Sequence, residues 1–170
     1  NLTAYPISMG LLPYVAREIY DLDQNGLGQL VAGYSGGALI GSIAMIMSGG
    51  ARRPGRFMVL SIIAWYALMV IFAWQETKWP GFAILLLVGI MQSTAMISMS
   101  VILLQITPEQ FRGRIMGVRI LAVYGLPVGL LAAGALVDWT GFSNAVTIYT
   151  LLGILCTGWI ALKWRAVIWR

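Results

Sequence analysis

The chain has 170 residues, of which 59% are hydrophobic and 10% are charged. Soluble domains carry about 25% charged residues, so a water-soluble globular domain is a poor explanation of this composition. The net charge of +5 does not indicate nucleic-acid binding, because the basic residues gather at the edges of long uncharged stretches, where a membrane surface would lie.

The uncharged stretches are long enough to cross a lipid bilayer. A hydrocarbon core about 30 Å thick takes roughly 20 apolar residues in a helix. We therefore predict an all-α membrane protein with six transmembrane helices, at about residues 1–18, 27–49, 57–74, 80–106, 115–137 and 144–162.

The first predicted span contains two prolines, Pro6 and Pro13. Each proline removes a backbone donor and favours a kink or a break in the helix. In lipid the freed carbonyl groups need neighbours or water, so this helix either faces the protein interior or uses its kink only for packing. In the first case Tyr5, Ser8 and Tyr14 are its polar candidates.

The second and fifth spans carry glycines at a spacing of four, Gly33, Gly37 and Gly41 in one and Gly125 and Gly129 in the other. This spacing leaves one helix face bare and allows a second helix to approach closely. The first run also fits the G-x-S-x-G pattern of a hydrolase, but a chain without His lacks the usual base. With no His and one Cys we expect no enzyme, no metal site and no cofactor.

The fourth span is long and polar in places, whereas the third and sixth are almost wholly apolar and are predicted to face lipid. Its polar residues are Gln92, Ser93, Thr94, Ser98, Ser100 and Gln105. Thr94, Ser98 and Gln105 fall near one face, which favours the lining of a cavity. Each hydroxyl can also bond its own helix backbone.

The two halves of the chain repeat one order of helices. Spans one to three and four to six each run from a polar or broken helix, through a glycine-rich helix, to an apolar helix. The two triplets cross the membrane in opposite senses, so the sequence predicts an inverted three-plus-three repeat.

The charged residues at the span ends are sorted by side. One set of ends carries Arg52, Arg53, Arg56, Arg112, Arg114, Arg119, Lys163, Arg165 and Arg170. The other set carries Arg17, Lys78, Glu18, Asp21, Asp23, Glu76 and Asp138. Because Lys and Arg collect on the cytoplasmic side of short loops, we expect the first set, and both ends of this segment, to face the cytoplasm.

The arginine-rich loops allow two interpretations. They are either a patch that sets orientation and touches anionic lipid, or a gate whose arginines change partners between conformations. The gate candidates are Arg53, Gly55, Arg56, Arg112, Gly113, Arg114 and Arg119. Arg119 lies more than a turn inside the fifth span, where it either snorkels to the cytoplasmic edge or contacts a gate or substrate.

The segment Thr107–Gly117 resembles the P-x-x-x-R-G-R-x-x-G connection between spans ten and eleven of major facilitator superfamily exporters. The continuation through Gly125–Gly129 and Gly134–Gly141, and the run Gly33–Gly41, resemble the branch of enterobactin-exporter-like and macrolide-efflux-like proteins. Two positions depart from the family patterns: Arg52 stands where the loop motif has an acid, and Leu126 precedes Pro127 where the antiporter motif has Gly.

The resemblance implies the C-terminal six-span half of a secondary transporter in a bacterial inner membrane, with an N-terminal half outside this chain. Its implied activity is alternating-access export of small hydrophobic molecules, such as drugs or siderophores, driven by protons. The implied cavity residues, which also suit a tolerant apolar pocket, are Tyr5, Tyr34, Gln92, Thr94, Met96 and Tyr124. The expected partners are lipid, the other half, the substrate and protons, with no nucleic acid.

Two other hypotheses fit the same sequence. One is a six-span transporter that assembles as a homodimer, and the other is a membrane scaffold or assembly subunit that transports nothing.

Overall fold

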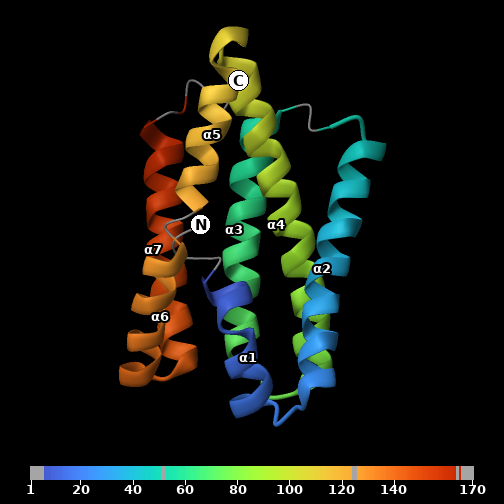
Figure 1. Ribbon diagram of the computed structural model, residues 1–170, viewed down its shortest axis with the longest axis vertical. Coiled ribbons are helices and arrows are strands. Elements are labelled where there is room, and N and C mark those ends of the chain that lie inside the picture. Colours follow the sequence, from blue (N-terminus) through green and yellow to red (C-terminus); the bar gives the residue numbers. More distant parts are fainter. Residues whose placement is uncertain (1–5, 51–52, 124–125, 164, 166–170) are drawn as a thin grey trace.

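The computed structural model describes residues 6–50, 53–123, 126–163 and 165, which form helices and no strand. The elements run lengthwise in one elongated bundle (Figure 1). In chain order they are η1 (Pro6–Gly10), α1 (Leu12–Tyr14), η2 (Val15–Ile19), α2 (Gln24–Met47), α3 (Pro54–Ala73), α4 (Lys78–Ile106), η3 (Glu109–Phe111), α5 (Arg112–Val123), α6 (Leu126–Thr140) and α7 (Phe142–Lys163).

Four of the described helices, α2, α3, α4 and α7, are long and apolar enough to cross a membrane, and Pro127–Thr140 in α6 is a shorter apolar helix. The prediction of an all-helical membrane protein is confirmed at this level. The number of six crossings and the inverted repeat remain predictions.

Local chemistry explains where α2 begins and ends. The carboxylate of Asp23 accepts the backbone N–H of Gly26 at 2.9 Å and so caps the N-terminus. At the other end Gly49 and Gly50 take φ angles of +70° and +83°, which favour glycine, and donate their N–H groups to the carbonyls of Ile46 and Met45.

The first predicted span is a broken helix in its described part, Pro6–Ile19. The three-residue α1 lies between the wider π-helical turns η1 and η2. Pro13 cannot donate to the carbonyl four residues earlier, so the helix widens around it. The N–H of Tyr20, for example, donates to the carbonyl of Val15, five residues back.

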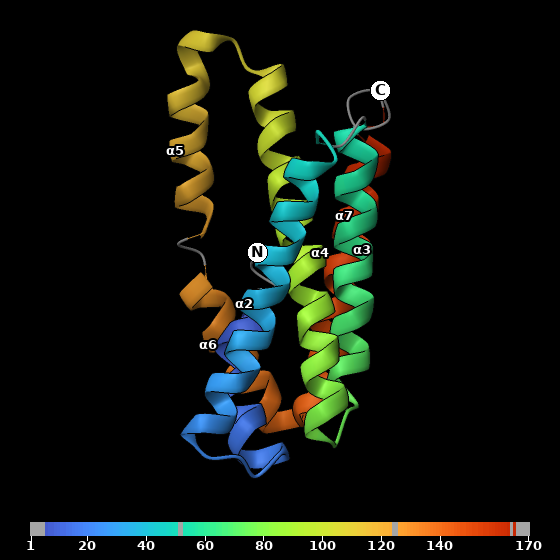
Figure 2. The ribbon, with the colours of Figure 1, turned by 90° about the vertical axis from the view of Figure 1, so that its right-hand side faces the viewer.

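The fifth predicted span is divided between α5 and α6, with residues 124–125 outside the description. The chain changes direction between the two helices (Figure 2). Pro127 lies in the first turn of α6, where its missing N–H breaks no helical bond.

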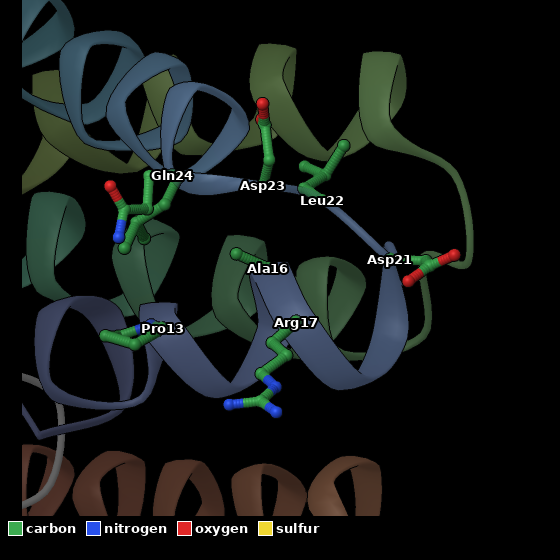
Figure 3. Close-up of a pocket in the computed structure, with 8 residues that line it drawn as sticks. Pro13, Ala16, Arg17, Asp21, Leu22, Asp23 and Gln24 are labelled. Carbon is green, nitrogen blue, oxygen red and sulfur yellow. The ribbon is translucent and has the colours of Figure 1, made fainter.

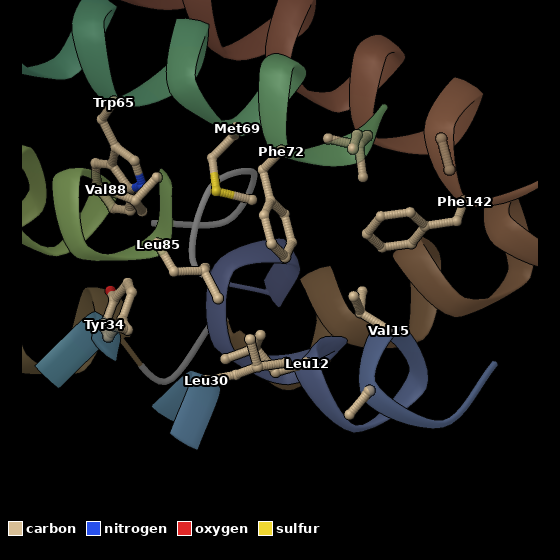
Figure 4. Packing of buried hydrophobic residues seen from close by; sticks show 14 of the residues in the cluster. Leu12, Val15, Leu30, Tyr34, Trp65, Met69, Phe72, Leu85, Val88 and Phe142 are labelled. Atoms are coloured by element: carbon tan, nitrogen blue, oxygen red, sulfur yellow. The ribbon is translucent and has the colours of Figure 1, made fainter. Parts of the chain in front are cut away.

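Helix α4 forms the centre of the packing. Its most extensive contacts are with α2 and α3, while α7 packs on α3, and α6 packs on α7 and η1. Large buried side chains from α1, η2, α2, α3, α4 and α7 meet in one cluster (Figure 4). It includes Leu12, Val15, Leu30, Tyr34, Trp65, Met69, Phe72, Leu85, Val88 and Phe142.

The charged helix ends separate onto the two ends of the bundle. The starts of α3 and α5 and the end of α7 lie together at the top of Figure 1, and they carry Arg53, Arg56, Arg112, Arg114 and Lys163. The start of α2, the start of α4 and the turn between α6 and α7 lie at the opposite end. The two ends are called the arginine end and the acidic end below.

Candidate functional site

The glycine face of α2 lies directly against α4. A Cβ atom added at Gly37 would meet the backbone carbonyl of Leu86, and one added at Gly41 would lie 2.8 Å from the carbonyl of Ile90. Gly33 packs on the ring of Phe82. Small residues therefore let the two backbones approach to a distance that no larger side chain allows.

Two sides of α4 are used for packing on other helices. Gly89 and Ser93 face α2. A Cβ added at Gly89 would meet the backbone of Tyr34, and a Cβ added at Gly41 would meet the Ser93 hydroxyl. Thr94 faces α3: its hydroxyl donates to the Met91 carbonyl at 2.9 Å and lies 3.3 Å from the Ser61 hydroxyl.

The predicted cavity residues are distributed over different surroundings. Tyr34 is buried between α2, α3 and α4 (Figure 4), and Thr94 is buried at the α3–α4 contact. Gln92 and Met96, one helical turn apart on α4, are half-buried, and Met96 packs against the buried cluster. Tyr5 and Tyr124 lie outside the described residues. Gln92 and Met96 are thus the described candidates that are not fully buried.

The fifth span contributes fewer contacts to the bundle than α2 or α3 does. Gly129 of α6 is buried, and its carbonyl accepts the Tyr149 hydroxyl of α7 at 3.2 Å. Gly125, the other predicted packing residue of this span, lies outside the described part of the chain.

A pocket at the arginine end lies beside the turn between α2 and α3. It encloses about 590 Å³ and is lined by Met45, Ser48, Gly50, Arg53, Arg56, Phe57 and Leu60. Arg53 is exposed, Arg56 is half-buried and Gly55 is buried in the first turn of α3. Two cations above apolar side chains form an amphipathic surface at a membrane edge, which suits a gate contact or a lipid headgroup.

The second arginine loop is held by local contacts. Arg112 pairs with Glu109 at 3.3 Å, and the guanidinium of Arg114 lies 6.0 Å from the ring centre of Phe111. Gly113 between them is exposed and has open space around it. Both interactions are exposed to solvent and contribute little to stability.

Arg119 lies on α5 and contacts a second helix. It is half-buried, and its Nη2 lies 3.4 Å from the backbone carbonyl of Met96 on α4. Within the described residues this contact is the only hydrogen bond that its guanidinium makes. The structure therefore turns Arg119 toward α4.

A second pocket, of about 570 Å³, lies at the acidic end where η2 leads into α2. Its charged side chains, Arg17, Asp21 and Asp23, point away from one another (Figure 3). The N–H of Gly26 holds the pKa of Asp23 below its ordinary value of 3.8, because the hydrogen bond favours the carboxylate. Asp23 therefore serves to start α2.

Sequence reasoning did not find this pocket or the contact between Arg119 and Met96. The pocket could have been suspected from the four charged residues within seven positions after Ala16, three of which line it. For the Arg119 contact the sequence shows only a charged residue inside a span. Its partner is a backbone carbonyl, which every residue has, so no side chain indicates it. In the part of the chain that is described, no group of His, Cys, Asp and Glu side chains could hold a metal ion.

The sequence profile of the family described as Major Facilitator Superfamily matches residues 1–168. No curated protein and no solved structure matches the chain.

Proposed function

Since this chain belongs to the Major Facilitator Superfamily over nearly its whole length and is a membrane transporter by that membership, we propose that it works by alternating access as a secondary exporter of small hydrophobic molecules. The observation that carries the proposal is the family match over residues 1–168, on a chain whose described part has four helices long and apolar enough to span a bilayer. In such transporters a bundle rocks against a second one around a site near the membrane midplane.

The substrate path in this proposal runs along the side of α4 that carries Gln92 and Met96. Gln92 is the middle residue of α4 and is half-buried. Met96, one turn further on, adds a flexible and polarizable side chain that adapts to different apolar molecules. Tyr5 and Tyr124 remain proposed members of the same lining.

The second bundle in this proposal is an N-terminal six-span half of the same protein. Exposed apolar side chains on α2 form a surface that lipid or this second bundle can cover: Leu39 is 61% exposed, Ile46 78% and Met47 82%. Every acidic residue of the present chain lies at or beyond a helix end. The acid that couples transport to protons is therefore proposed to belong to the other half.

The arginine loops form the cytoplasmic gate in the proposed cycle. Arg53 and Arg56 line one pocket at the arginine end, and Arg112 and Arg114 lie in the first turn of α5 at the same end. Cations at these positions pair with carboxylates or helix C-termini of the second half when the cytoplasmic side closes.

The test is efflux of a panel of fluorescent drugs and iron chelators from cells that express the complete reading frame. The proposal expects lower accumulation of at least one compound than in cells with an empty vector, and loss of that difference when a protonophore is added. Equal accumulation of every compound with and without the gene contradicts export, and an unchanged difference with the protonophore contradicts proton coupling.

A further inference from the structure

Arg119 places a positive charge deep in the predicted membrane region. Met96 lies four residues from the middle of α4, or about 6 Å along the helix axis. The guanidinium of Arg119 contacts the carbonyl of this residue. The hydrocarbon core is about 30 Å thick, so the level of Met96 lies within it. A charge at this level costs free energy unless it is paired or faces a polar path.

The side chain also reaches sideways to a neighbouring helix, whereas a snorkelling arginine extends toward the membrane edge. Helix α5 leaves the arginine end antiparallel to α4 (Figure 2). The Cα of Arg119 lies about 10 Å below Arg112, whereas Met96 lies about 15 Å below Ile106, the last residue of α4. Both residues therefore lie inside the bundle, about 10 Å or more from the arginine ends of their helices.

The contact that Arg119 makes does not use all of its hydrogen-bond donors. A guanidinium has five N–H donors and a full charge. Its partner is a carbonyl at 3.4 Å that also accepts the Ser100 hydroxyl at 2.8 Å. Most donors of Arg119 have no acceptor among the described residues, and the side chain remains half-buried.

No carboxylate of this chain balances the charge. The six acidic residues are all described: Glu18, Asp21, Asp23, Glu76, Glu109 and Asp138. Five of them belong to the acidic end of the bundle, and Glu109 pairs with Arg112 in the exposed loop. The negative partner of Arg119 must come from outside these residues.

Resting on the proposed transport function, we infer that Arg119 is the anion-binding residue of the substrate site and that the substrate class is an apolar molecule with one negatively charged group. The half-buried Gln92 and Met96 on the same side of α4 receive the apolar part, and the guanidinium receives the carboxylate or a similar oxyanion. Arg is suited to this role because its planar fork binds two oxygens at once.

The experiment measures flux in proteoliposomes that contain the protein from its complete reading frame. The probes are pairs of radiolabelled naphthalene carboxylates and the matching carboxamides, which differ in charge but hardly in shape. For wild-type protein we expect faster flux of the carboxylate in at least one pair, above the leak of empty liposomes.

Arg119→Gln should lower the carboxylate flux by about tenfold or more, because hydrogen bonds to charged groups contribute about 1.5–3 kcal/mol, and should change the amide flux by less than about twofold. Arg119→Lys, which keeps the charge, should retain part of the preference. Arg165→Gln, an exposed residue beyond α7, is the matched control and should change neither flux.

The outcomes separate this inference from the proposal on which it rests. Wild-type protein that moves no probe faster than empty liposomes contradicts the transport function itself. Wild-type flux that Arg119→Gln leaves unchanged overturns the anion site. A loss that is equal for both members of a pair also overturns it, and indicates that Arg119 pairs with a carboxylate of another bundle.

Discussion

Helices α2 and α5 both run beside α4, but they are attached to it in different ways. The α2 contact joins backbone to backbone, with Gly37 on one helix and Gly89 on the other. The α5 contact consists mainly of one arginine that reaches a carbonyl, and Val118, Ile120 and Leu121 remain 60% exposed or more. A glycine contact fixes the distance between two helices, whereas a single polar contact can be exchanged. Motion in this bundle is therefore expected between α4 and α5 rather than between α4 and α2.

The largest effect is expected where the α2 contact is closest. Gly37→Ala places a Cβ against the carbonyl of Leu86, and because a backbone atom cannot rotate away, the helices must separate. Overpacking of this kind should lower the free energy of unfolding by about 2 kcal/mol or more. Thermal melting of the detergent-solubilised protein, followed by circular dichroism, measures it.

Gly36→Ala is the matched control for this prediction. It changes the adjacent glycine of the same helix, where a Cβ would meet nothing within 4 Å. Alanine should then be neutral or stabilise the helix by up to about 1 kcal/mol. Equal melting temperatures for the two variants would contradict the close approach of α2 and α4.

The next effect concerns Gln92 on α4, in the proposed substrate path. Gln92→Leu removes a polar group from the proposed substrate path and should change the rank order of exported compounds, with individual fluxes shifting by about tenfold. Ile71→Leu, an exposed apolar change on α3, should leave the order as it is. The measurement is efflux of the compound panel, and similar profiles for both variants would contradict the assignment of the two helices.

The four long helices could be predicted from the sequence because charges or prolines bound their apolar runs. The structure begins α2 at Gln24 and ends α4 at Ile106, within about three residues of the predicted span ends. The widened turns beside Pro13 could not be predicted in detail, because proline indicates a break but not the hydrogen bonds that replace it.

The candidate site could be predicted less completely. The family resemblance and the side-chain type indicate Tyr34, Gln92 and Thr94 as cavity residues, but the rotation of α2 and α4 about their axes decides which of them is buried. The structure buries Tyr34 and Thr94 and leaves Gln92 half-buried. The direction of Arg119 depends on the relative position of two helices, which the sequence of neither helix specifies.

A smaller effect is expected from the hydroxyl contact between α3 and α4. Thr94→Val keeps the shape but removes the interaction with Ser61, and should lower the free energy of unfolding by about 0.6 kcal/mol, the average for polar contacts between membrane helices. Thr147→Val is the control, since among the described residues that hydroxyl bonds the carbonyl of Ser143 in its own helix and no other group. A double-mutant cycle with Ser61→Ala isolates the interaction, and a coupling energy of zero would contradict it.

The smallest effect is a dependence on acid at the start of α2. The pKa of Asp23 is lowered in the folded protein by the N–H of Gly26, so its contribution to stability is present above the ordinary pKa of 3.8 and is lost as the pH falls through the lowered value. Asp23→Asn keeps a capping oxygen without a titrating group. Melting temperatures below pH 4 should therefore fall less steeply for this variant, and parallel curves would contradict the cap.

The most direct test of the account is the side of the membrane on which the two ends of the bundle lie. Single cysteines are introduced by Arg112→Cys and Glu76→Cys into a Cys156→Ala background, and intact cells are treated with a membrane-impermeant maleimide. The account predicts labelling at position 76 in intact cells and at position 112 only after permeabilisation. Labelling at position 112 in intact cells would contradict the predicted orientation and the cytoplasmic gate that depends on it.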